Sequence, residues 1–527
     1  MIEKDTYIEE LNQIGHLLTT EKDLNVLMQK ILTAAKKLTN SDAGTFYLMS
    51  EDERSLQFTA VQTDSLGLSL SRAENTIPWP NLPLYMEDGE PNHINASVSC
   101  ALNDEFFNIP DVYFTDKFNF EGPKAFDVST GYRTKSMLIV PMKNHEGDII
   151  GVLQLINKMD NDEITIPFTE LDEKLILSMS SQAAISITQK KLIEGLENLL
   201  DSFVQSIATA IGEKSKYTQG HVNRVAEISL MIANAINEDK EGFYKDEYFD
   251  KDRLKQLDVA AWMHDIGKIT TPEYVVDKSK KLETIHDRIN TVEAKFEVLK
   301  KELEIQYLKE YIQAVDKVKQ KELEDRFKNK LNRISDDFNF IKDTNTGGEF
   351  MSDDKIDRIH SIAQHEIEIN GEKQKLLTKD EVENLCIRKG TLTESERFVI
   401  NNHAKISYDM LNTLPFPKKL KNVPLIAGGH HEKLNGEGYP FGLKGDEIGL
   451  ESRILAVADI FEALTAHDRP YKKPNSLNQS MRILSFMIKD QELDEKLVKF
   501  FVEKGLHLEY AKDNLNESQM DEITVEF

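Results

Sequence analysis

The spacing of apolar residues is the feature that most constrains this fold. From Ser202 to His507 apolar residues recur three and four positions apart nearly throughout. In "YTQGHVNRVAEISLMIANAI", for example, Val225, Ile228 and Ile232 would share one helix face. This pattern predicts an all-α domain. Histidines and aspartates occur in it at positions where helices should be buried.

The region before this domain has a different pattern. Apolar residues at helical spacing predict a helix within residues 1–38, whereas residues 44–62 and 136–157 are rich in β-forming residues. The turn segment "KNHEGD" in the second stretch predicts a β-hairpin, and a helix should follow over about 169–191. These elements predict a compact α+β domain.

Charge and composition exclude several classes of function. The formal net charge of −26 argues against general nucleic-acid or anionic-membrane binding. No run of eighteen apolar residues predicts a transmembrane helix, and the polar start "MIEKDTYIEELNQIGHLL" does not resemble a signal peptide. The two cysteines form no disulfide framework or zinc motif, so we expect a cytoplasmic protein. A small anionic substrate would need local positive charge from metals or from placed Lys and Arg.

Five histidines and two aspartates of the helical region are candidate metal ligands. Each alone could be a hydrogen-bonded core residue or a helix cap. Burying seven such groups without partners would be costly, however, and two divalent metals would satisfy all of them. The seven residues are His221, His264, Asp265, His403, His430, His431 and Asp459.

The local sequence around these residues fits that interpretation. "LDVAAWMHDIGK" ends a helix with a His-Asp pair, and the glycines of "GGHHEKLNGEGYP" allow adjacent histidines to lie where a helix ends. Thr393 and Glu396 form a capping box for a helix that should contain His403. Imidazole with carboxylate suits iron, manganese or zinc rather than magnesium or calcium. Two such metals can clamp the attacking and leaving oxygens of a phosphoryl displacement, with Asp265 as the natural bridge.

Two motifs resemble a known family. His264-Asp265 with Lys268 resembles the HD superfamily of metal phosphohydrolases, and "HHEKLNGEGYP" is similar to the HD-GYP signature of bacterial cyclic di-GMP phosphodiesterases. The resemblance covers about residues 200–280 and 390–500. It implies two divalent transition metals, most readily Fe or Mn, with Lys268 and Asp265 in catalytic roles. The implied first metal is held by His221, His264, Asp265 and Asp459, and the second by Asp265, His403, His430 and His431.

The resemblance also implies substrate contacts. Lys268 would contact the scissile phosphate, and Tyr439 would form part of the pocket wall. Arg453 and Arg469 fall where basic residues face the substrate, although a structural ion pair with Asp468 or Glu462 is an equal alternative.

One position departs from some family members. They bind a third metal through a Glu four residues before the first histidine, and this position is Tyr217 here. A phenol is a poor ligand at neutral pH. We therefore expect two metals and no third.

Residues 20–190 resemble a GAF domain, an antiparallel sheet flanked by helices. Its cyclic-nucleotide-binding pattern is matched by Asn157, Lys158, Phe168, Asp172 and Glu173. The resemblance implies a small-molecule or cyclic-nucleotide ligand. Alternatively, Asn157-Lys158 ends a strand, and Asp172-Glu173 lie in the first turn of a helix, where carboxylates favour the helix dipole.

Two further helical segments complete the domain organisation. Residues 185–207 carry a heptad-like apolar stripe, which predicts either a connector helix in a homodimer or one amphipathic helix packed on its own domain. Residues 281–390 predict a hairpin of long helices without chemistry of its own, which leaves a partner-binding role open. The predicted segments are an N-terminal helix (1–19), a GAF domain (20–190), a connector (191–210), an HD-GYP domain (211–280 and 391–515) and a helical insertion (281–390).

These inferences predict a metal-dependent phosphodiesterase regulated by its GAF domain. It would hydrolyse cyclic di-GMP to linear pGpG, with GMP as the product of a second cut. The alternatives are a 3′,3′-cyclic GMP-AMP phosphodiesterase, a catalytically weak cyclic-dinucleotide-sensing scaffold, or a nucleotide phosphohydrolase of the broader HD superfamily.

Overall fold

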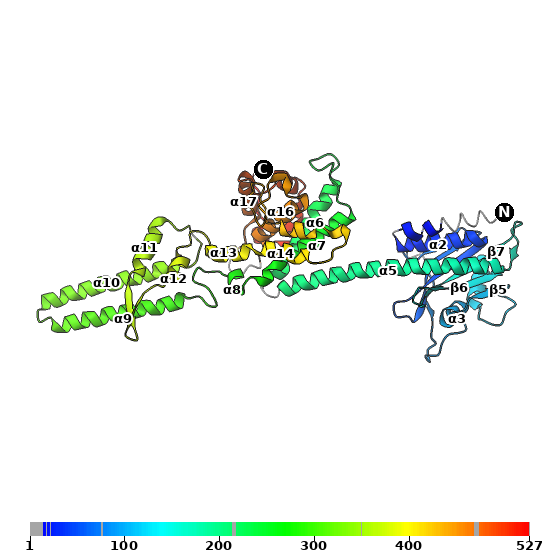
Figure 1. The fold of residues 1–527 in the computed structure, drawn as a ribbon, viewed down its shortest axis with the longest axis horizontal. Coiled ribbons are helices and arrows are strands. Elements are labelled where there is room, and N and C mark those ends of the chain that lie inside the picture. Colours follow the sequence, from blue (N-terminus) through cyan, green and yellow to red (C-terminus); the bar gives the residue numbers. More distant parts are fainter. Residues whose placement is uncertain are drawn as a thin grey trace. The chain divides into compact units, whose positions relative to one another are not determined.

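The computed structural model describes residues 14–16, 18–21, 23–74, 77–212, 218–348, 350–467 and 474–525. The chain divides into two compact units, Met1–Leu199 and Leu200–Phe527. Figure 1 shows the elements of each unit. Within the described ranges, no helix has both the length and the apolar character that crossing a bilayer requires.

The N-terminal unit is built on one antiparallel sheet. Its strand order is β3-β2-β1-β7-β6-β5, with β4 paired to β2 and β8 paired to β7. The predicted hairpin is present, because β6 and β7 pair antiparallel on either side of "KNHEGD". The strands are β1 (Ser41–Met49), β2 (Ser55–Thr63), β3 (Leu68–Ser71), β4 (Leu82–Pro83), β5 (Phe107–Ile109), β6 (Met137–Lys143), β7 (Ile149–Met159) and β8 (Thr165–Ile166).

Helices cover both faces of this sheet. On one face, α2 (Leu24–Thr39) and the first part of α5 (Glu170–Gly212) pack their apolar residues against the strands in one core (Figure 1). On the other face, α3 (Ala96–Asn103) contributes to a second core, and α4 (Glu121–Thr130) follows β5. Strand β1 is therefore buried along nearly its whole length. The predicted α+β fold is confirmed.

The C-terminal unit contains the predicted all-α domain. Its helices surround a single large apolar core that includes Val225, Ile228 and Ile232. The helices are α6 (Thr218–Glu238), α7 (Lys251–Met263), α8 (Glu273–Val276), α13 (Glu394–Asn401), α14 (His403–Asn412), α15 (Val423–Gly428), α16 (Leu450–Thr465), α17 (Leu477–Lys489), α18 (Glu495–Glu503) and α19 (Leu506–Asn514). Short 3₁₀ turns lie between some of them, namely η1 (Ile266–Thr270), η2 (Lys418–Leu420) and η3 (Gly445–Glu447), and η4 (Glu517–Gln519) follows α19.

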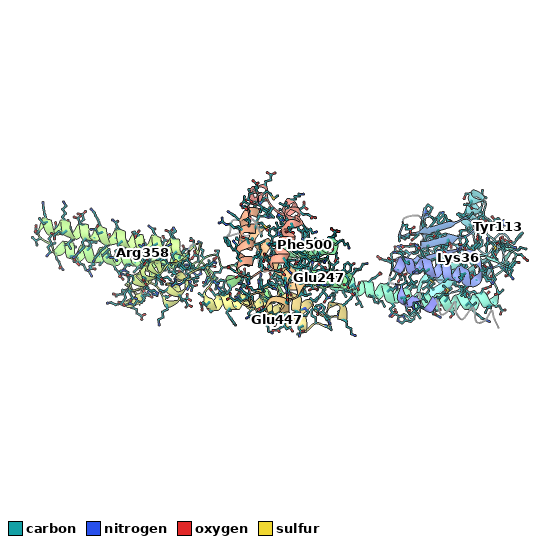
Figure 2. The ribbon with its side chains drawn as sticks, turned by 90° about the horizontal axis from the view of Figure 1, so that it is seen from above. Lys36, Tyr113, Glu247, Arg358, Glu447 and Phe500 are labelled. Atoms are coloured by element: carbon teal, nitrogen blue, oxygen red, sulfur yellow. The ribbon has the colours of Figure 1, made fainter. Side chains whose placement is uncertain are left out.

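The insertion has its own apolar core, which includes Phe296 and Phe338. The predicted hairpin is formed by α9 (Ile289–Gln313) and α10 (Lys317–Thr344), which lie side by side (Figure 1). Arg358 of α11 (Asp353–Ala363), which is labelled in Figure 2, binds Asp336 at 2.6 Å and Asp337 at 2.9 Å, so α11 is fastened to α10. A two-stranded sheet, β9 (Glu366–Ile369) with β10 (Glu372–Lys375), was not predicted, and α12 (Lys379–Leu385) follows it.

Candidate metal centre and active site

All seven predicted metal ligands lie together in the C-terminal unit, and six are buried. They come from α6, the end of α7, the start of α14, the turn after α15, and α16. Their candidate ligand atoms form three groups, with all atoms of a group within 4.8 Å of one another. The groups are His221, His264 and Asp459; His264, Asp265 and His430; and His403, His430 and His431.

Asp265 lies between two sets of histidines. Its Oδ1 is 3.3 Å from Nε2 of His403, whereas its Oδ2 is 3.3 Å from Nε2 of His264 and 3.7 Å from Nε2 of His221. Each oxygen of one carboxylate therefore faces a different set of imidazole nitrogens. This arrangement can bridge two cations.

Backbone carbonyl groups fix the orientation of three imidazoles. Nδ1 of His264 donates to the Ala261 carbonyl at 2.7 Å. His403 and His430 repeat this contact with the carbonyl three residues earlier, each at 2.5 Å. Because a carbonyl only accepts, Nδ1 carries the proton, and Nε2 of a neutral ring is left with a lone pair. Such contacts orient metal-binding histidines in many proteins.

The Nε2 lone pairs of these three buried imidazoles point toward one another and toward Asp265. The Nε2 atoms of His403 and His430 face each other at 3.4 Å. The buried Nε2 of His264 has no hydrogen-bond partner among the described residues. A cation between these nitrogens would satisfy them, so the residues present fit divalent metals.

The second set is Asp265 with His403, His430 and His431. Shifted pKa values within it also suit metal binding. Burial, with the nearby histidines, lowers the pKa of His430 well below its usual value. Burial lowers the pKa of His431 to about 3. Burial alone would raise the pKa of Asp265, but Lys268 and the histidines outweigh it and hold that pKa well below its usual value. His430 and His431 are therefore neutral imidazoles and Asp265 is an ionised carboxylate at neutral pH.

The charge balance differs in the first set, which is His221, His264, Asp265 and Asp459. Nε2 of His221 is 3.2 Å from Oδ1 of Asp459. Burial lowers the pKa of His221, but hydrogen bonds to Asp459 and Glu462 outweigh this effect and raise it to about 10. The same contact with His221 lowers the pKa of Asp459, against the effect of its burial. A metal at this position would compete with a proton on His221.

Lys268 supplies the positive charge that a phosphate would require. It lies in η1, and its Nζ is 2.6 Å from Oδ2 of Asp265. Burial alone would lower its pKa, but the Asp265 carboxylate raises it, so the ammonium stays charged.

The loop after His430 and His431 is shaped by a buried carboxylate. Glu432 accepts hydrogen bonds from the backbone N–H groups of Phe441 at 2.6 Å, Gly442 at 3.2 Å and Leu443 at 2.9 Å. A Cβ at Gly438 would lie 2.3 Å from the backbone nitrogen of Lys433, so only glycine fits there. The chain therefore turns sharply after the two histidines.

This loop brings Tyr439 beside the second set of ligands. The centroid of its ring is 4.9 Å from that of His431. Its backbone nitrogen donates to the carbonyl of His431 at 3.2 Å. Its ring therefore forms a wall next to the histidines.

The prediction for the helix around His403 needs one correction. Thr393 and Glu396 form the predicted capping box, but this helix ends at Asn401, and His403 is the first residue of α14. At this break, Nδ1 of His403 donates a hydrogen bond to the carbonyl of Ile400. A Cβ at Gly267 would lie 2.1 Å from the His403 carbonyl oxygen, so η1 packs directly on the start of α14.

The two arginines and Tyr217 have separate outcomes. The guanidinium of Arg453 binds Asp494 at 3.0 Å and the carbonyls of Ile448 at 2.8 Å and Gly445 at 2.9 Å. These contacts favour the structural ion pair over a substrate contact, although the partner differs from those considered from the sequence. Arg469 and Tyr217 lie outside the described residues.

Glu462 is a site residue that the sequence interpretation missed. Its side chain is fully buried, and its Oε2 binds Nδ1 of His221. Its Oε1 accepts from Nε of Arg224 at 2.7 Å. The available signal was its place three residues after Asp459, which puts both carboxylates on one face of α16.

The residues predicted to contact a GAF ligand make contacts within the domain. Lys158 Nζ pairs with Asp172 at 2.5 Å, and this pair joins β7 to the start of α5. Asn157 Oδ1 accepts from the Lys135 backbone at 2.7 Å, and Glu173 accepts from Asn108 at 2.7 Å. The fifth residue, Phe168, belongs to the apolar core.

The N-terminal unit contains a separate cavity of about 330 Å³. The described residues that line it include none of the five predicted from the cyclic-nucleotide-binding pattern. Lys158, Asp172 and Glu173 join α5 to the sheet, whereas Asn157 holds the segment before β6. Ligand binding by the five residues stays a prediction.

Comparison with known proteins agrees with the fold. The GAF domain family matches residues 23–187, and HD domain families match residues 218–338 and 378–497. The chain therefore carries a GAF domain followed by a helical HD domain. With its Gly-Tyr-Pro loop beside the histidine cluster, it has the GAF–HD-GYP architecture that the sequence resemblance implies.

Three curated relatives share short segments with this chain. The 3′3′-cGAMP-specific phosphodiesterase 1 of Vibrio cholerae is 42% identical over 22% of this chain and 26% of that protein. The cyclic di-GMP phosphodiesterase response regulator RpfG of Xanthomonas campestris is 39% identical over 19% of this chain and 26% of that protein. A probable cyclic di-GMP phosphodiesterase of Vibrio cholerae is 40% identical over 19% and 24%. The matches thus span about a quarter of each relative.

Proposed function

We propose that this chain is a metal-dependent phosphodiesterase that hydrolyses a cyclic dinucleotide, with cyclic di-GMP as the favoured substrate. The observation that carries this proposal is Asp265, whose two oxygens face separate histidine sets. The names of the three relatives support the substrate class.

The chain's own residues have distinct roles in this reaction. The seven clustered residues would hold two divalent metals, and Fe or Mn suits their nitrogen and carboxylate donors. When bound, a metal pair polarises the phosphate and activates water. The Lys268 ammonium neutralises charge that develops on the phosphate oxygens. Tyr439 limits the pocket beside His431, and Glu432 keeps its loop in place.

A second substrate has specific support. A relative that is 42% identical over its matched segment is named as specific for 3′3′-cGAMP. Both cyclic dinucleotides carry the same two phosphodiester linkages. The two substrates differ in one base, so the pocket wall rather than the metal ligands should discriminate between them.

The test is hydrolysis by the full-length chain purified without oxygen. Cyclic di-GMP and 3′3′-cGAMP would be incubated separately with Fe(II) or Mn(II), and the products followed by chromatography. We expect a linear dinucleotide from at least one of them, and none from an Asp265→Asn variant. Hydrolysis of mononucleotides alone, with both cyclic dinucleotides intact, would reject the proposal.

We also propose a ligand class for the GAF cavity. The described residues that line it carry no formal charge, and several are aromatic, including Phe58, Trp79, Phe126 and Tyr132. A phosphate buried there would lack a charged partner, which is costly. Planar uncharged compounds such as purine bases fit this lining better than cyclic nucleotides. Tighter binding of cyclic AMP or cyclic GMP than of adenine or guanine, measured by calorimetry, would contradict this assignment.

We also propose that two copies of the chain form a parallel homodimer through α5. An apolar stripe on this helix is more than two-fifths exposed at every position: Ile185, Leu192, Leu196, Leu199 and Phe203. Its successive spacings of seven, four, three and four residues match a coiled-coil seam. Packing on a second copy would cover the stripe, which its own domain leaves open. Analytical ultracentrifugation of a Leu192→Lys/Leu199→Lys variant should show a monomer where the unmodified chain shows a dimer.

A further inference from the structure

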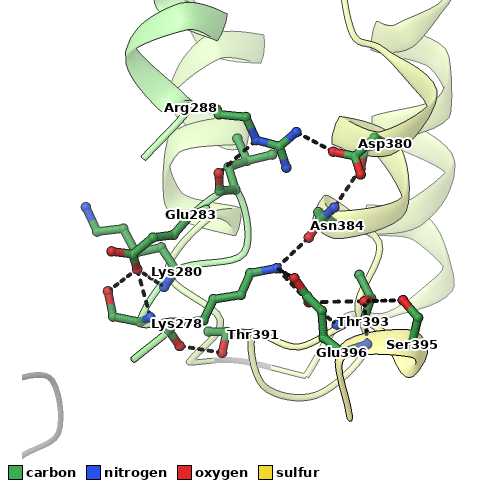
Figure 3. Close-up of polar contacts among 12 residues, drawn as sticks. Lys278, Lys280, Glu283, Arg288, Asp380, Asn384, Thr391, Thr393, Ser395 and Glu396 are labelled. Carbon is green, nitrogen blue, oxygen red and sulfur yellow. Dashed lines mark hydrogen bonds and ion pairs between the residues drawn. The ribbon is translucent and has the colours of Figure 1, made fainter. Parts of the chain in front are cut away.

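The two chain segments that connect the HD domain to the insertion meet at Lys278 (Figure 3). Its side chain is fully buried. The ammonium donates to both carboxylate oxygens of Glu396 at 2.8 Å and to Oδ1 of Asn384 at 2.7 Å. All three donors of the ammonium are therefore used. A buried charge requires such complete pairing, so the three side chains hold one another in fixed positions.

These three residues belong to three different segments. Lys278 follows α8, Asn384 lies in α12 of the insertion, and Glu396 lies in the first turn of α13. The hydroxyl of Thr391 also donates to the Lys278 carbonyl at 2.9 Å, which ties the returning segment to the outgoing one. Figure 3 shows Lys278 at the centre of this network, with the insertion on one side and α13 on the other.

From Glu396 the connection continues to a candidate metal ligand. The Glu396 carboxylate that binds Lys278 also accepts from the backbone nitrogen of Thr393 at 2.8 Å, and so fixes the start of α13. The last turn of α13 carries Ile400, whose carbonyl orients the His403 imidazole at 2.5 Å. The position of α13 therefore sets the direction of the His403 Nε2 lone pair.

We propose that Lys278 is a positioning residue that couples the insertion to the second metal site. One ammonium holds Asn384 of the insertion and Glu396 of α13, and α13 places the carbonyl that aims His403. This inference rests on the proposed function, because it assumes that His403 binds a metal. It gives the insertion a route to the active site through the buried Lys278 side chain.

The test compares Lys278→Met with Lys280→Met in the full-length chain. Lys280 is a matched control, because it lies two residues away and pairs with Asp287 at 3.1 Å with its own side chain 48% exposed. Binding of Mn(II) would be titrated and counted per folded protein. In Lys278→Met we expect one of two metals to bind about 10–100-fold more weakly, as for other residues that orient metal ligands. The other metal should bind as in the control.

Kinetics separates positioning from simple stabilisation. In Lys278→Met, kcat should fall at limiting Mn(II) and recover at excess Mn(II), with KM unchanged. Asn384→Ala cuts only the contact with the insertion and should shift the same metal in the same direction by a smaller factor. If Lys278→Met does not fold, Glu396→Gln removes the same charge pair and takes its place.

Two results would overturn the inference. One is a lower unfolding temperature in Lys278→Met with both metal affinities equal to those of Lys280→Met. The other is an unchanged metal affinity in Asn384→Ala, which would remove the insertion from the route. An unmodified chain that binds no metal or cleaves no cyclic dinucleotide would instead reject the proposed function before any variant is compared.

Discussion

The buried carboxylate of Glu462 binds Nδ1 of His221 and directs the Nε2 of this imidazole toward Asp459, 3.2 Å away. Its second oxygen holds Arg224 at the same time. Glu462 thus has one oxygen for each of two donors. The orientation of a candidate ligand in the first metal set depends on a residue that is not itself a ligand.

Glu462→Gln should weaken metal binding. An amide has only one oxygen, so either His221 or Arg224 loses its acceptor. We expect one metal to bind about 10–100-fold more weakly, measured by Mn(II) titration. Glu451→Gln is the matched control, because Glu451 lies on the same helix and accepts from Arg253 at 2.6 Å. Equal metal affinities in the two variants would show that Glu462 does not orient His221.

Metal binding should release protons unequally at the two sets. The raised pKa of His221, about 10, means that its imidazole is protonated at pH 7.5 in the metal-free chain. The lowered pKa values of His430 and His431 mean that both are already neutral. Metal binding at the first set should therefore release about one proton and strengthen as the pH rises toward 10.

Calorimetric titration with Mn(II) in two buffers of different ionisation enthalpy counts these protons. His430 and His431 should contribute none of the released protons. A metal affinity at the first set that does not change between pH 6.5 and 8.5 would contradict the charge state assigned to His221.

Lys158→Met should destabilise the GAF domain without a direct effect on its cavity. Asp172, whose side chain is 4% exposed, would lose its charged partner. Removing one member of such a buried pair typically costs about 3 kcal/mol of unfolding free energy. Lys174→Met is the control, because Lys174 is 77% exposed and lies 4.0 Å from Glu170. Urea denaturation that gives the same stability for both variants would contradict a structural role for Lys158.

A rotation of α5 after Glu197 should change the activity of the chain. One residue inserted after Glu197 turns the following residues of α5 by about 100° and breaks the apolar stripe. Seven inserted residues restore its register. We expect activity and dimer formation to fall strongly in the first variant and to recover largely in the second. Equal activity in the two variants would remove the coupling through α5.

Periodicity predicted most of the fold, because helices and strands with one buried face leave their spacing in the sequence. It predicted the sheet hairpin, the all-α domain and the paired long helices. The strands β9 and β10 were not predicted, because each has only four residues and both are mainly exposed. The end of a helix before His403 also escaped, because the imidazole contact with Ile400 depends on side-chain orientation.

Candidate metal ligands could be predicted because several histidines and aspartates rarely occupy buried positions without a shared partner. Their supporting residues could not. Glu462 and Glu432 are acidic residues of a kind that is common on helix surfaces, and only tertiary packing buries them. The more buried carboxylate partner of Arg453 is Asp494, 41 residues away, and no local pattern connects the two.

Metal counting in two single variants tests the central claim most directly. Elemental analysis, normalised to folded protein, would compare the unmodified chain, Asp265→Ala, His403→Ala and the exposed control His360→Ala. Asp265 faces both sets, so its loss should empty both sites. Without this shared anion, two bound cations would repel each other. His403 belongs to only one set, so its loss should leave about one of the two metals bound. The account therefore predicts two metals in the unmodified chain and in His360→Ala, none in Asp265→Ala and one in His403→Ala. A single metal in the unmodified chain, or one retained in Asp265→Ala, would contradict the bridging carboxylate.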